Sequence, residues 1–258
     1  MKVKRTYLAA GMAALMIGIT AAPTFAAPTP QTNSYPASLE TESLHVENLK
    51  AAENASQLIL VVGTGEGSKV TVSYYIREDQ ENLGPGQKED DKWVKKFETK
   101  GVYGRNGAST EKKEGDGKTP EGTFGITMAF GLLESPGSIL PYHQIETGDY
   151  WVDDSDSIYY NQLVNTRDVT QSWKSAENMT GGVPEYYYGL ALDYNKECVP
   201  GAGSAIFLHC TIKESLEEET GSAGCVRIPQ ELMKQLVQSV DKDTKIVIVS
   251  DASRLEYQ

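Results

Sequence analysis

The residue types best suited to chemistry lie close together in the last quarter of the chain. His209 follows an apolar run, Ala205-Ile-Phe-Leu208, and Cys225 follows a polar loop, within Ser222-Ala-Gly-Cys-Val-Arg227. A cysteine nucleophile needs a base to take its proton, and acyl transfer also needs backbone N–H donors for the oxyanion. A glycine directly before the cysteine lets the backbone approach a substrate carbonyl. The segment therefore predicts acyl transfer by Cys225 with His209 as its proton partner.

The chain offers one rival base and no pattern typical of a metal site. His143, within Pro141-Tyr-His-Gln144, is the rival base. We assign it and Tyr142 to the substrate groove, with an ordinary loop position as the alternative. The aspartates within 153–156 lack the glycine and glutamate that follow at fixed positions in a calcium-binding EF-hand loop. Because the Cys and His spacing also fits no zinc site, we expect neither a metal nor another cofactor.

Apolar runs separated by turn residues predict a mainly β fold, in which a buried strand delivers His209. Residues 70–76 alternate between apolar and polar side chains, as in a strand with one buried face. From Pro229 to Val240 the apolar residues follow helical spacing, and proline suits the first position of a helix. Residues 141–180 show little periodicity, which indicates an elaborated loop region. The expected strands are residues 58–62, 70–76, 93–99, 122–130, 186–194, 204–209 and 246–249.

The N-terminus and the charge balance indicate where the protein acts. Residues 1–26 combine a positive start, an apolar stretch and small residues near Ala26, the pattern of a cleaved secretory signal peptide. The 258 residues include 36 acidic and 24 basic ones, and the net charge of −12 argues against nucleic-acid binding. We therefore expect a secreted or cell-wall-associated protein with one domain at 57–251. A loose linker at 27–56 would precede this domain and a tail at 252–258 would follow it.

The number of cysteines is too small for a disulfide scaffold. The chain has three, and an odd number in an exported protein leaves at least one thiol free. Spacing leaves a bridge between Cys198 and Cys210 open, in which case Cys225 would be the free thiol.

Three segments of the chain, taken together, resemble the L,D-transpeptidase catalytic domain family, also called the YkuD family. The first is His209 followed by Ser222-Ala-Gly-Cys-Val-Arg227. The second is residues 115–124, with the sequence Lys-Thr-Pro-Glu-Gly at its centre. The third, Tyr150-Trp-Val-Asp-Asp154 through Tyr159-Tyr-Asn161, is similar to a Gram-positive branch of the family. The resemblance covers residues 57–250 and implies a mainly β, sandwich-like fold.

The resemblance also implies roles for the catalytic residues. Cys225 would attack a peptide carbonyl, and His209 would exchange the proton with it. The main-chain carbonyl of Cys210 would orient the imidazole ring.

The turn before Cys225 would carry the oxyanion site. The resemblance implies that the N–H groups of Gly224 and Cys225 form this site and that Ser222 helps to orient it. Arg227 would support the turn or contact a substrate carboxylate. Ala223 departs from the family, which often has histidine there, so the groove is expected to differ.

By this resemblance the expected function is cell-wall synthesis by an exported peptidoglycan L,D-transpeptidase. The enzyme would join a donor stem peptide to an amine acceptor through a cysteine thioester, forming 3–3 cross-links, and carbapenems would inhibit it. Hydrolysis instead of amine transfer would make it an L,D-carboxypeptidase. The sequence also leaves open a sortase-like transpeptidase and an inactive wall-binding module. Four glutamates between His209 and Ser222 are expected to attract the cationic acceptor: Glu214, Glu217, Glu218 and Glu219.

Overall fold

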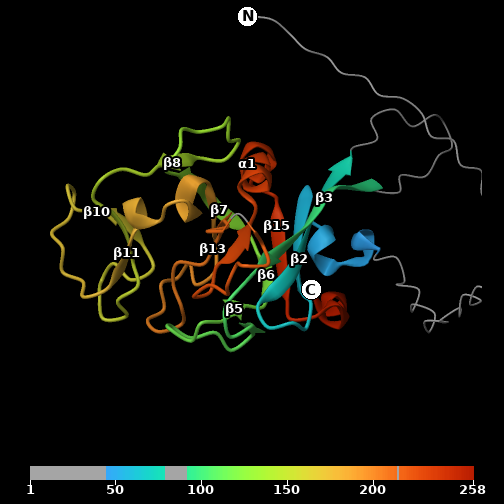
Figure 1. Cartoon of the computed structure of the whole chain (residues 1–258), viewed down its shortest axis with the longest axis horizontal. Coiled ribbons are helices and arrows are strands. Elements are labelled where there is room, and N and C mark those ends of the chain that lie inside the picture. The colour runs from blue at the N-terminus through green and yellow to red at the C-terminus, as the bar shows by residue number, and fades with distance from the viewer. Residues whose placement is uncertain (1–44, 79–91, 214) are drawn as a thin grey trace, which may run out of the picture. The chain divides into compact units, whose positions relative to one another are not determined.

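Ten strands form the main sheet of the protein, in the order β6-β15-β1-β2-β3-β14-β13-β12-β7-β8 (Figure 1). The computed structural model describes residues 45–78, 92–213 and 215–258. The strands of this sheet are β1 (Gln57–Gly63), β2 (Lys69–Glu78), β3 (Lys92–Val102), β6 (Gly122–Phe124), β7 (Ile126–Gly131), β8 (Tyr142–Gln144), β12 (Gly189–Leu192), β13 (Phe207–Cys210), β14 (Val226–Ile228) and β15 (Lys245–Val249).

The order of two short strands shows that the sheet curls strongly. β6 and β7 are separated in sequence only by Gly125, yet they lie near opposite ends of the strand order. The two ends of the sheet must therefore come together at Gly125, whose N–H donates to Oδ1 of Asp193 at 2.8 Å. The expected sandwich is thus formed by one curled sheet whose halves face each other.

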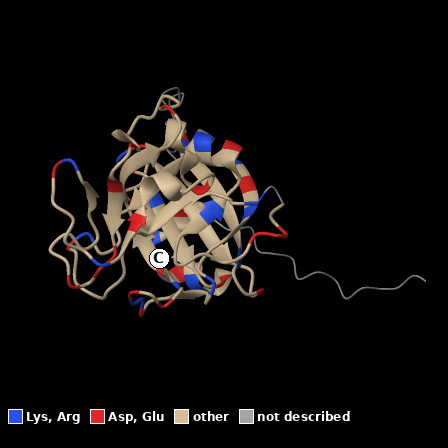
Figure 2. Cartoon of the chain, turned by 60° about the vertical axis from the view of Figure 1, so that its left-hand side comes forward, with Lys and Arg blue, Asp and Glu red and all other residues tan. Residues whose placement is uncertain are grey.

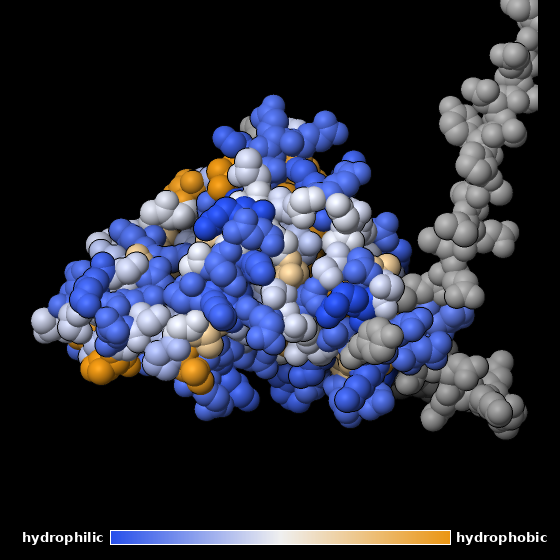
Figure 3. Space-filling model, turned by 90° about the horizontal axis from the view of Figure 1, so that it is seen from below, coloured by the Kyte–Doolittle hydropathy of each residue, from blue (hydrophilic) through white to orange (hydrophobic). Residues whose placement is uncertain are grey.

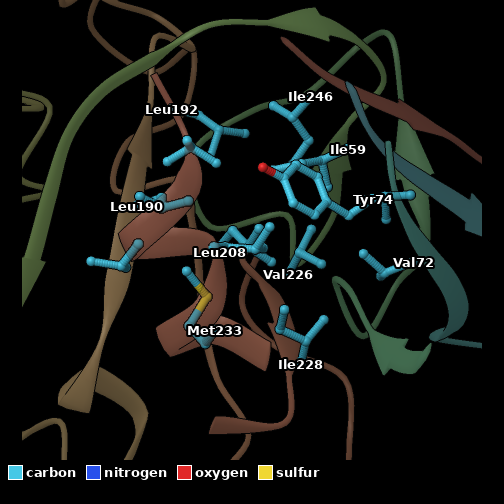
Figure 4. Packing of buried hydrophobic residues seen from close by; sticks show 14 of the residues in the cluster. Ile59, Val72, Tyr74, Leu190, Leu192, Leu208, Val226, Ile228, Met233 and Ile246 are labelled. Carbon is cyan, nitrogen blue, oxygen red and sulfur yellow. The ribbon is translucent and has the colours of Figure 1, made fainter. Parts of the chain in front are cut away.

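Apolar side chains from both halves of the sheet fill the space between them. Figure 4 shows Ile59 and Tyr74 on one side of this core and Leu190 on the other. The helix α1 (Gln230–Ser239) packs on the same core through Met233, Leu236 and Val237, which are fully buried. The predicted helix near the C-terminus is therefore confirmed, although Pro229 takes its N-cap position and not its first helical position.

The expected strands at 58–62, 70–76, 93–99 and 246–249 are confirmed within β1, β2, β3 and β15. The expected strand at 122–130 is two strands, broken at Gly125. The expected strand at 186–194 begins only at Gly189, because Glu185–Tyr187 forms a 3-10 turn, η4. The expected strand at 204–209 begins at Phe207, because Ala205 has a φ of 52° and cannot continue it.

The loop region at 141–180 contains a small second sheet with the order β10-β9-β11, which lies on the left in Figure 1. Its strands are β9 (Asp149–Val152), β10 (Leu163–Asn165) and β11 (Ala176–Asn178), and η3 (Met179–Gly181) follows them. A two-stranded pair, β4 (Ala108–Ser109) and β5 (Thr119–Pro120), lies before β6.

Both ends of the described chain pack onto the sheet. The 3-10 turns η1 (Val46–Asn48) and η2 (Lys50–Ala52) bury apolar side chains against β1 and β15. The 3-10 helix η5 (Ala252–Tyr257) adds Leu255 to the same cluster. Residues 46–55 of the expected linker and the expected tail are therefore ordered parts of the domain, because their apolar side chains are buried there. The predicted signal peptide, and the linker up to residue 44, lie outside the described residues.

One face of the domain is mainly polar. Figure 3 shows this face as mostly hydrophilic with scattered apolar residues, and the cartoon in Figure 2 shows Lys and Arg positions interspersed with Asp and Glu positions along the chain. Among residues 45–78, 92–213 and 215–258, no helix has both the length and the apolar character to cross a membrane.

Candidate active site

The pairing of β13 with β14 places the predicted catalytic residues on one face of the sheet. These strands run parallel, with Leu208 opposite Val226 and His209 opposite Arg227. Since alternate side chains of a strand share a face, His209, Arg227 and Cys225 point to the same side. The intervening residues point to the opposite side, into the core shown in Figure 4. Burial of Leu208 and Cys210 in the core therefore makes the His209 side chain point to the other face of the sheet.

The Cys225 thiol is almost completely enclosed. The residue is 6% exposed, and its Sγ lies 3.2 Å from the carbonyl oxygen of Ala205, which accepts the thiol proton. Burial raises the pKa of the Cys225 thiol far above its usual range, and the nearby carboxylate of Glu177 raises it further. The Cys225 side chain is therefore a neutral thiol in this structure. All three cysteines are free, so Cys198 and Cys210 are not bridged.

The His209 ring is fixed by contacts on two sides. Its Nδ1 lies 2.9 Å from the carbonyl oxygen of Cys210, the contact that the family resemblance implies. The ring of Tyr186 meets it edge to face, with centroids 5.3 Å apart. Burial and then the charge of Arg227 lower the pKa of His209 to about 3. The imidazole is thus neutral at pH 7.

Ser222 shapes the turn that presents Cys225. Its hydroxyl donates to the carbonyl oxygen of Cys225 at 2.5 Å and accepts from the N–H of Gly224 at 3.0 Å. The Gly224 N–H, which we expected in the oxyanion site, therefore points to Ser222 in this structure, so we keep only the Cys225 N–H in that role. A side chain at Gly224 would come within 3.0 Å of the Lys118 carbonyl oxygen, so glycine is needed there for packing.

Arg227 forms ion pairs within the protein. Its Nη1 lies 3.1 Å from Oε1 of Glu219, and its Nη2 lies 3.3 Å from Oε1 of Glu185 in η4. Because two carboxylates already hold the guanidinium, Arg227 supports the fold around the site and is not placed to bind a substrate carboxylate. Its charge also acts on His209, as the lowered pKa of that ring shows.

A pocket of about 160 Å³ opens onto Cys225. Charged side chains of both signs line it, and we find them on β11, on the loop after β9 and on the segments around β4. Its lining includes Arg105, Lys112, Glu114, Asp153, Glu177 and Cys225. Among the residues described, no group of three or more His, Cys, Asp or Glu side chains is arranged to hold a metal ion.

A comparison with protein families shows which family the chain belongs to. The YkuD family model, described as the L,D-transpeptidase catalytic domain, matches residues 88–248, more than half of the chain. The chain belongs to this family. The match favours an L,D-transpeptidase over a sortase-like enzyme. No curated protein matches the chain in sequence.

Solved structures with a similar chain trace are only distantly related. The Bdellovibrio bacteriovorus protein Bd1075 is 16% identical, with a TM-score of 0.40, and the match covers 81% of this chain and 55% of that one. A cysteine-to-serine mutant of an Enterococcus faecium L,D-transpeptidase is 14% identical, with a TM-score of 0.31 and coverage of 76% and 50%. The chain therefore spans about half the length of these structures.

Two residues assigned to the substrate groove lie away from the YkuD-type site. Tyr142 and His143 are in β8, at the edge of the sheet, three strand spacings or about 14 Å from β13. The Tyr142 hydroxyl donates to the Leu133 carbonyl oxygen at 2.7 Å, and Nε2 of His143 lies 2.7 Å from Oδ2 of Asp149. Neither lines the pocket at Cys225, and their assignment to the substrate groove stays a prediction.

Two other residues support Cys225 and were not predicted to do so. The Thr119 hydroxyl donates to the Gly224 carbonyl oxygen at 2.7 Å and so fixes the turn that precedes Cys225. Oδ1 of Asn161 accepts from the N–H of Ala205 at 3.0 Å, which fixes the carbonyl group that accepts the Cys225 thiol. Both residues lie in segments that resemble the family, and this resemblance was the available signal.

Glu219 differs from its acidic neighbours in the loop between β13 and β14. It is only 3% exposed, and besides the ion pair with Arg227 its Oε2 accepts from the N–H groups of Ile212 and Lys213 at 3.0 and 2.8 Å. Its role is therefore to hold the loop, and its place in the expected amine-attracting cluster was wrong. Glu217 and Glu218 are exposed, and attraction of the acceptor stays a prediction for them. Glu214 lies outside the described residues.

Replacing Glu219 with glutamine should destabilise the domain by about 3 kcal/mol, because one partner of a buried ion pair is removed while the other stays. Chemical denaturation monitored by tryptophan fluorescence measures this loss. Glu218→Gln, which removes the same charge from an exposed position, should leave the free energy of unfolding unchanged. Equal effects of the two substitutions would contradict a structural role for Glu219.

Proposed function

We propose that the protein is an exported peptidoglycan L,D-transpeptidase that forms 3–3 cross-links through a thioester on Cys225. The observation that carries this proposal is the enclosed Cys225 thiol on the same sheet face as a neutral, fixed His209 ring. Membership of the YkuD family supports the reaction class. Export rests on the signal-peptide pattern of residues 1–26.

The first half of the reaction forms the thioester. His209 takes the proton of the Cys225 thiol as sulfur attacks the carbonyl between an L-centred diamino acid and a terminal D-Ala. The Cys225 N–H stabilises the oxyanion of the tetrahedral intermediate. The C–N bond then breaks, and His209 returns the proton to the nitrogen of the departing D-Ala. Because both groups start neutral, neither the Cys225 thiol nor the His209 ring carries a buried charge before the reaction begins.

The second half of the reaction consumes the thioester. A side-chain amine of a second stem peptide attacks the carbonyl, the C–S bond breaks and the Cys225 thiol is restored. Water in place of the amine would give an L,D-carboxypeptidase. The same thioester chemistry makes carbapenems, which are also acylating agents, expected inhibitors.

Mass spectrometry of stem-peptide products tests the function. The purified protein should release D-Ala from a tetrapeptide stem and, with a second stem as acceptor, yield a cross-linked dimer. A product shortened by D-Ala without dimers would indicate the carboxypeptidase instead. Absence of both products, together with no acyl adduct on Cys225, would overturn the proposal. Mass analysis of the secreted protein tests the predicted cleavage near Ala26.

A further inference from the structure

Two carboxylates on one wall of the Cys225 pocket have no role in the mechanism described so far. Glu177 lies in β11, opposite Trp151 of β9, and Asp153 directly follows β9. Both line the pocket together with Cys225. The small second sheet therefore brings two acidic side chains beside the nucleophile.

The hydrogen bonds of the pocket distinguish these carboxylates from two other charged groups in its lining, Lys112 and Glu114. Lys112 donates to Oδ1 of Asp116 at 2.7 Å, and Glu114 accepts from the hydroxyls of Tyr160 and Ser204 at 2.6 and 2.7 Å. These side chains are engaged in holding the pocket wall.

By contrast, the two carboxylates retain acceptor capacity. Oδ1 of Asp153 is buried without a hydrogen-bond partner, which is costly for a polar atom unless a ligand supplies one. Oε2 of Glu177 accepts from the hydroxyl of Tyr186, whose ring packs against His209. A cationic donor entering the pocket would meet the unpartnered Oδ1 of Asp153 and the second oxygen of the Glu177 carboxylate, Oε1.

We propose that Glu177 is a second catalytic residue, which takes a proton from the amine acceptor, and that Asp153 binds the same ammonium group. This inference rests on the proposed function, since it assigns the acceptor side of that reaction. It also divides the proton transfers between two residues. Glu177 removes the first proton from the entering ammonium group, and His209 exchanges protons with the Cys225 sulfur.

Atoms and protons balance in this step. The acceptor enters as an ammonium ion, and Glu177 takes one of its protons, leaving a neutral amine and a carboxylic acid. The amine nitrogen attacks the thioester carbonyl, a C–N bond forms and the C–S bond breaks. The proton that nitrogen loses on becoming an amide goes to the Cys225 sulfur through His209. Glu177 then releases its proton to solvent.

The surroundings of Glu177 suit this task. Burial raises the pKa of Glu177 to about 7, against the opposing effect of the Tyr186 hydroxyl. The carboxylates of Asp153 and Glu185 raise it further, whereas Arg227 lowers it. A carboxyl group that titrates near neutral pH can both accept and release a proton during turnover.

The test measures the two half-reactions separately as a function of pH. Acylation is followed as D-Ala release or carbapenem adduct formation, and transfer is followed as loss of the Cys225 thioester to an added amine acceptor. In the wild type, transfer should rise with pH through the neutral range as Glu177 ionises. Glu177→Gln should reduce transfer on the order of 10²-fold and remove this rise. Acylation should not slow, because this substitution removes the carboxylate that raises the pKa of the Cys225 thiol.

Two further variants and a control sharpen the test. Tyr186→Phe keeps the ring beside His209 but removes the hydroxyl that lowers the pKa of Glu177, so the rise should move to higher pH. Asp153→Asn should raise the KM for the amine with a smaller effect on kcat. Glu146→Gln, which removes one exposed charge paired with Arg167, should leave both half-reactions unchanged.

The outcomes separate this inference from the proposed function. If Glu177→Gln transfers at the wild-type rate, or keeps the neutral rise, the inference is wrong while the function stands. If it slows acylation and transfer equally, Glu177 is a structural residue and the inference is again overturned. If the wild type forms no thioester on Cys225, both the proposed function and the inference fail.

Discussion

Replacing Cys225 with alanine is expected to abolish turnover, reducing the rate by a factor on the order of 10⁴ or more. The only route to a covalent intermediate is lost, while the pocket and the His209 ring remain. D-Ala release from a tetrapeptide stem measures the effect. Intact-protein mass spectrometry adds a second measurement, since a single carbapenem adduct should form on the wild type and none on Cys225→Ala.

Cys198→Ala is the matched control for this substitution. Cys198 lies on the loop before Ala205 and is partly exposed. Its Sγ lies near the carbonyl oxygens of Lys196 and Asn161. Its loss should leave both turnover and the carbapenem adduct unchanged. Retained activity in Cys225→Ala, or an adduct on another residue, would contradict the whole mechanism.

Replacing His209 with alanine is expected to slow acylation by a factor on the order of 10² or more. The thiol would then lose its assigned proton acceptor, and burial already disfavours the thiolate. The pH dependence gives a second criterion. Because the folded protein holds the pKa of His209 at about 3, His209 remains a neutral base well below the usual pKa of 6.5. The acylation rate should therefore fall only in strongly acidic solution, and this acid limb should disappear in His209→Ala.

The control for this prediction is His143→Ala. His143 pairs with Asp149 at the sheet edge, so its removal should change neither the rate nor the pH profile of acylation. If His143→Ala slows acylation and His209→Ala does not, the assignment of the base is wrong. Stopped-flow or mass-resolved acylation across the pH range measures both variants.

The parts of the fold that could be predicted from sequence are those with a local signal. β1, β2, β15 and α1 follow apolar runs or periodic patterns within ten or so residues, and Cys225 and His209 were identified by residue type and spacing. The tyrosines at 186–188 mislead this reasoning, because aromatic residues also favour strands. Tyr186 instead contacts Phe130 and Phe207 from a 3-10 turn, and this tertiary packing outweighs strand preference.

The unpredicted parts of the site depend on contacts between distant positions. Thr119 supports Gly224 across 105 positions, and Glu185 holds Arg227 across 42. No local pattern marks such partners, and the side chains involved are common polar types. Glu177 is a further case, since only the pairing of β11 with β9 brings it to the pocket.

The position of β15 in the sheet limits how this domain can be made. β15 lies between β1 and β6, and Leu58 pairs with Lys245 across 187 positions. During synthesis, β1 therefore cannot pair with β15 until nearly all of the domain has been made. At about 5–20 residues per second, the 187 positions between them take on the order of 10–40 seconds. Closing so long a loop is also slow, because its entropy is lost before the strand contacts form. The nascent chain consequently keeps this edge of β1 unpaired for the whole interval, during which the apolar side chains of β1 lack the partner strand that covers them in the folded domain.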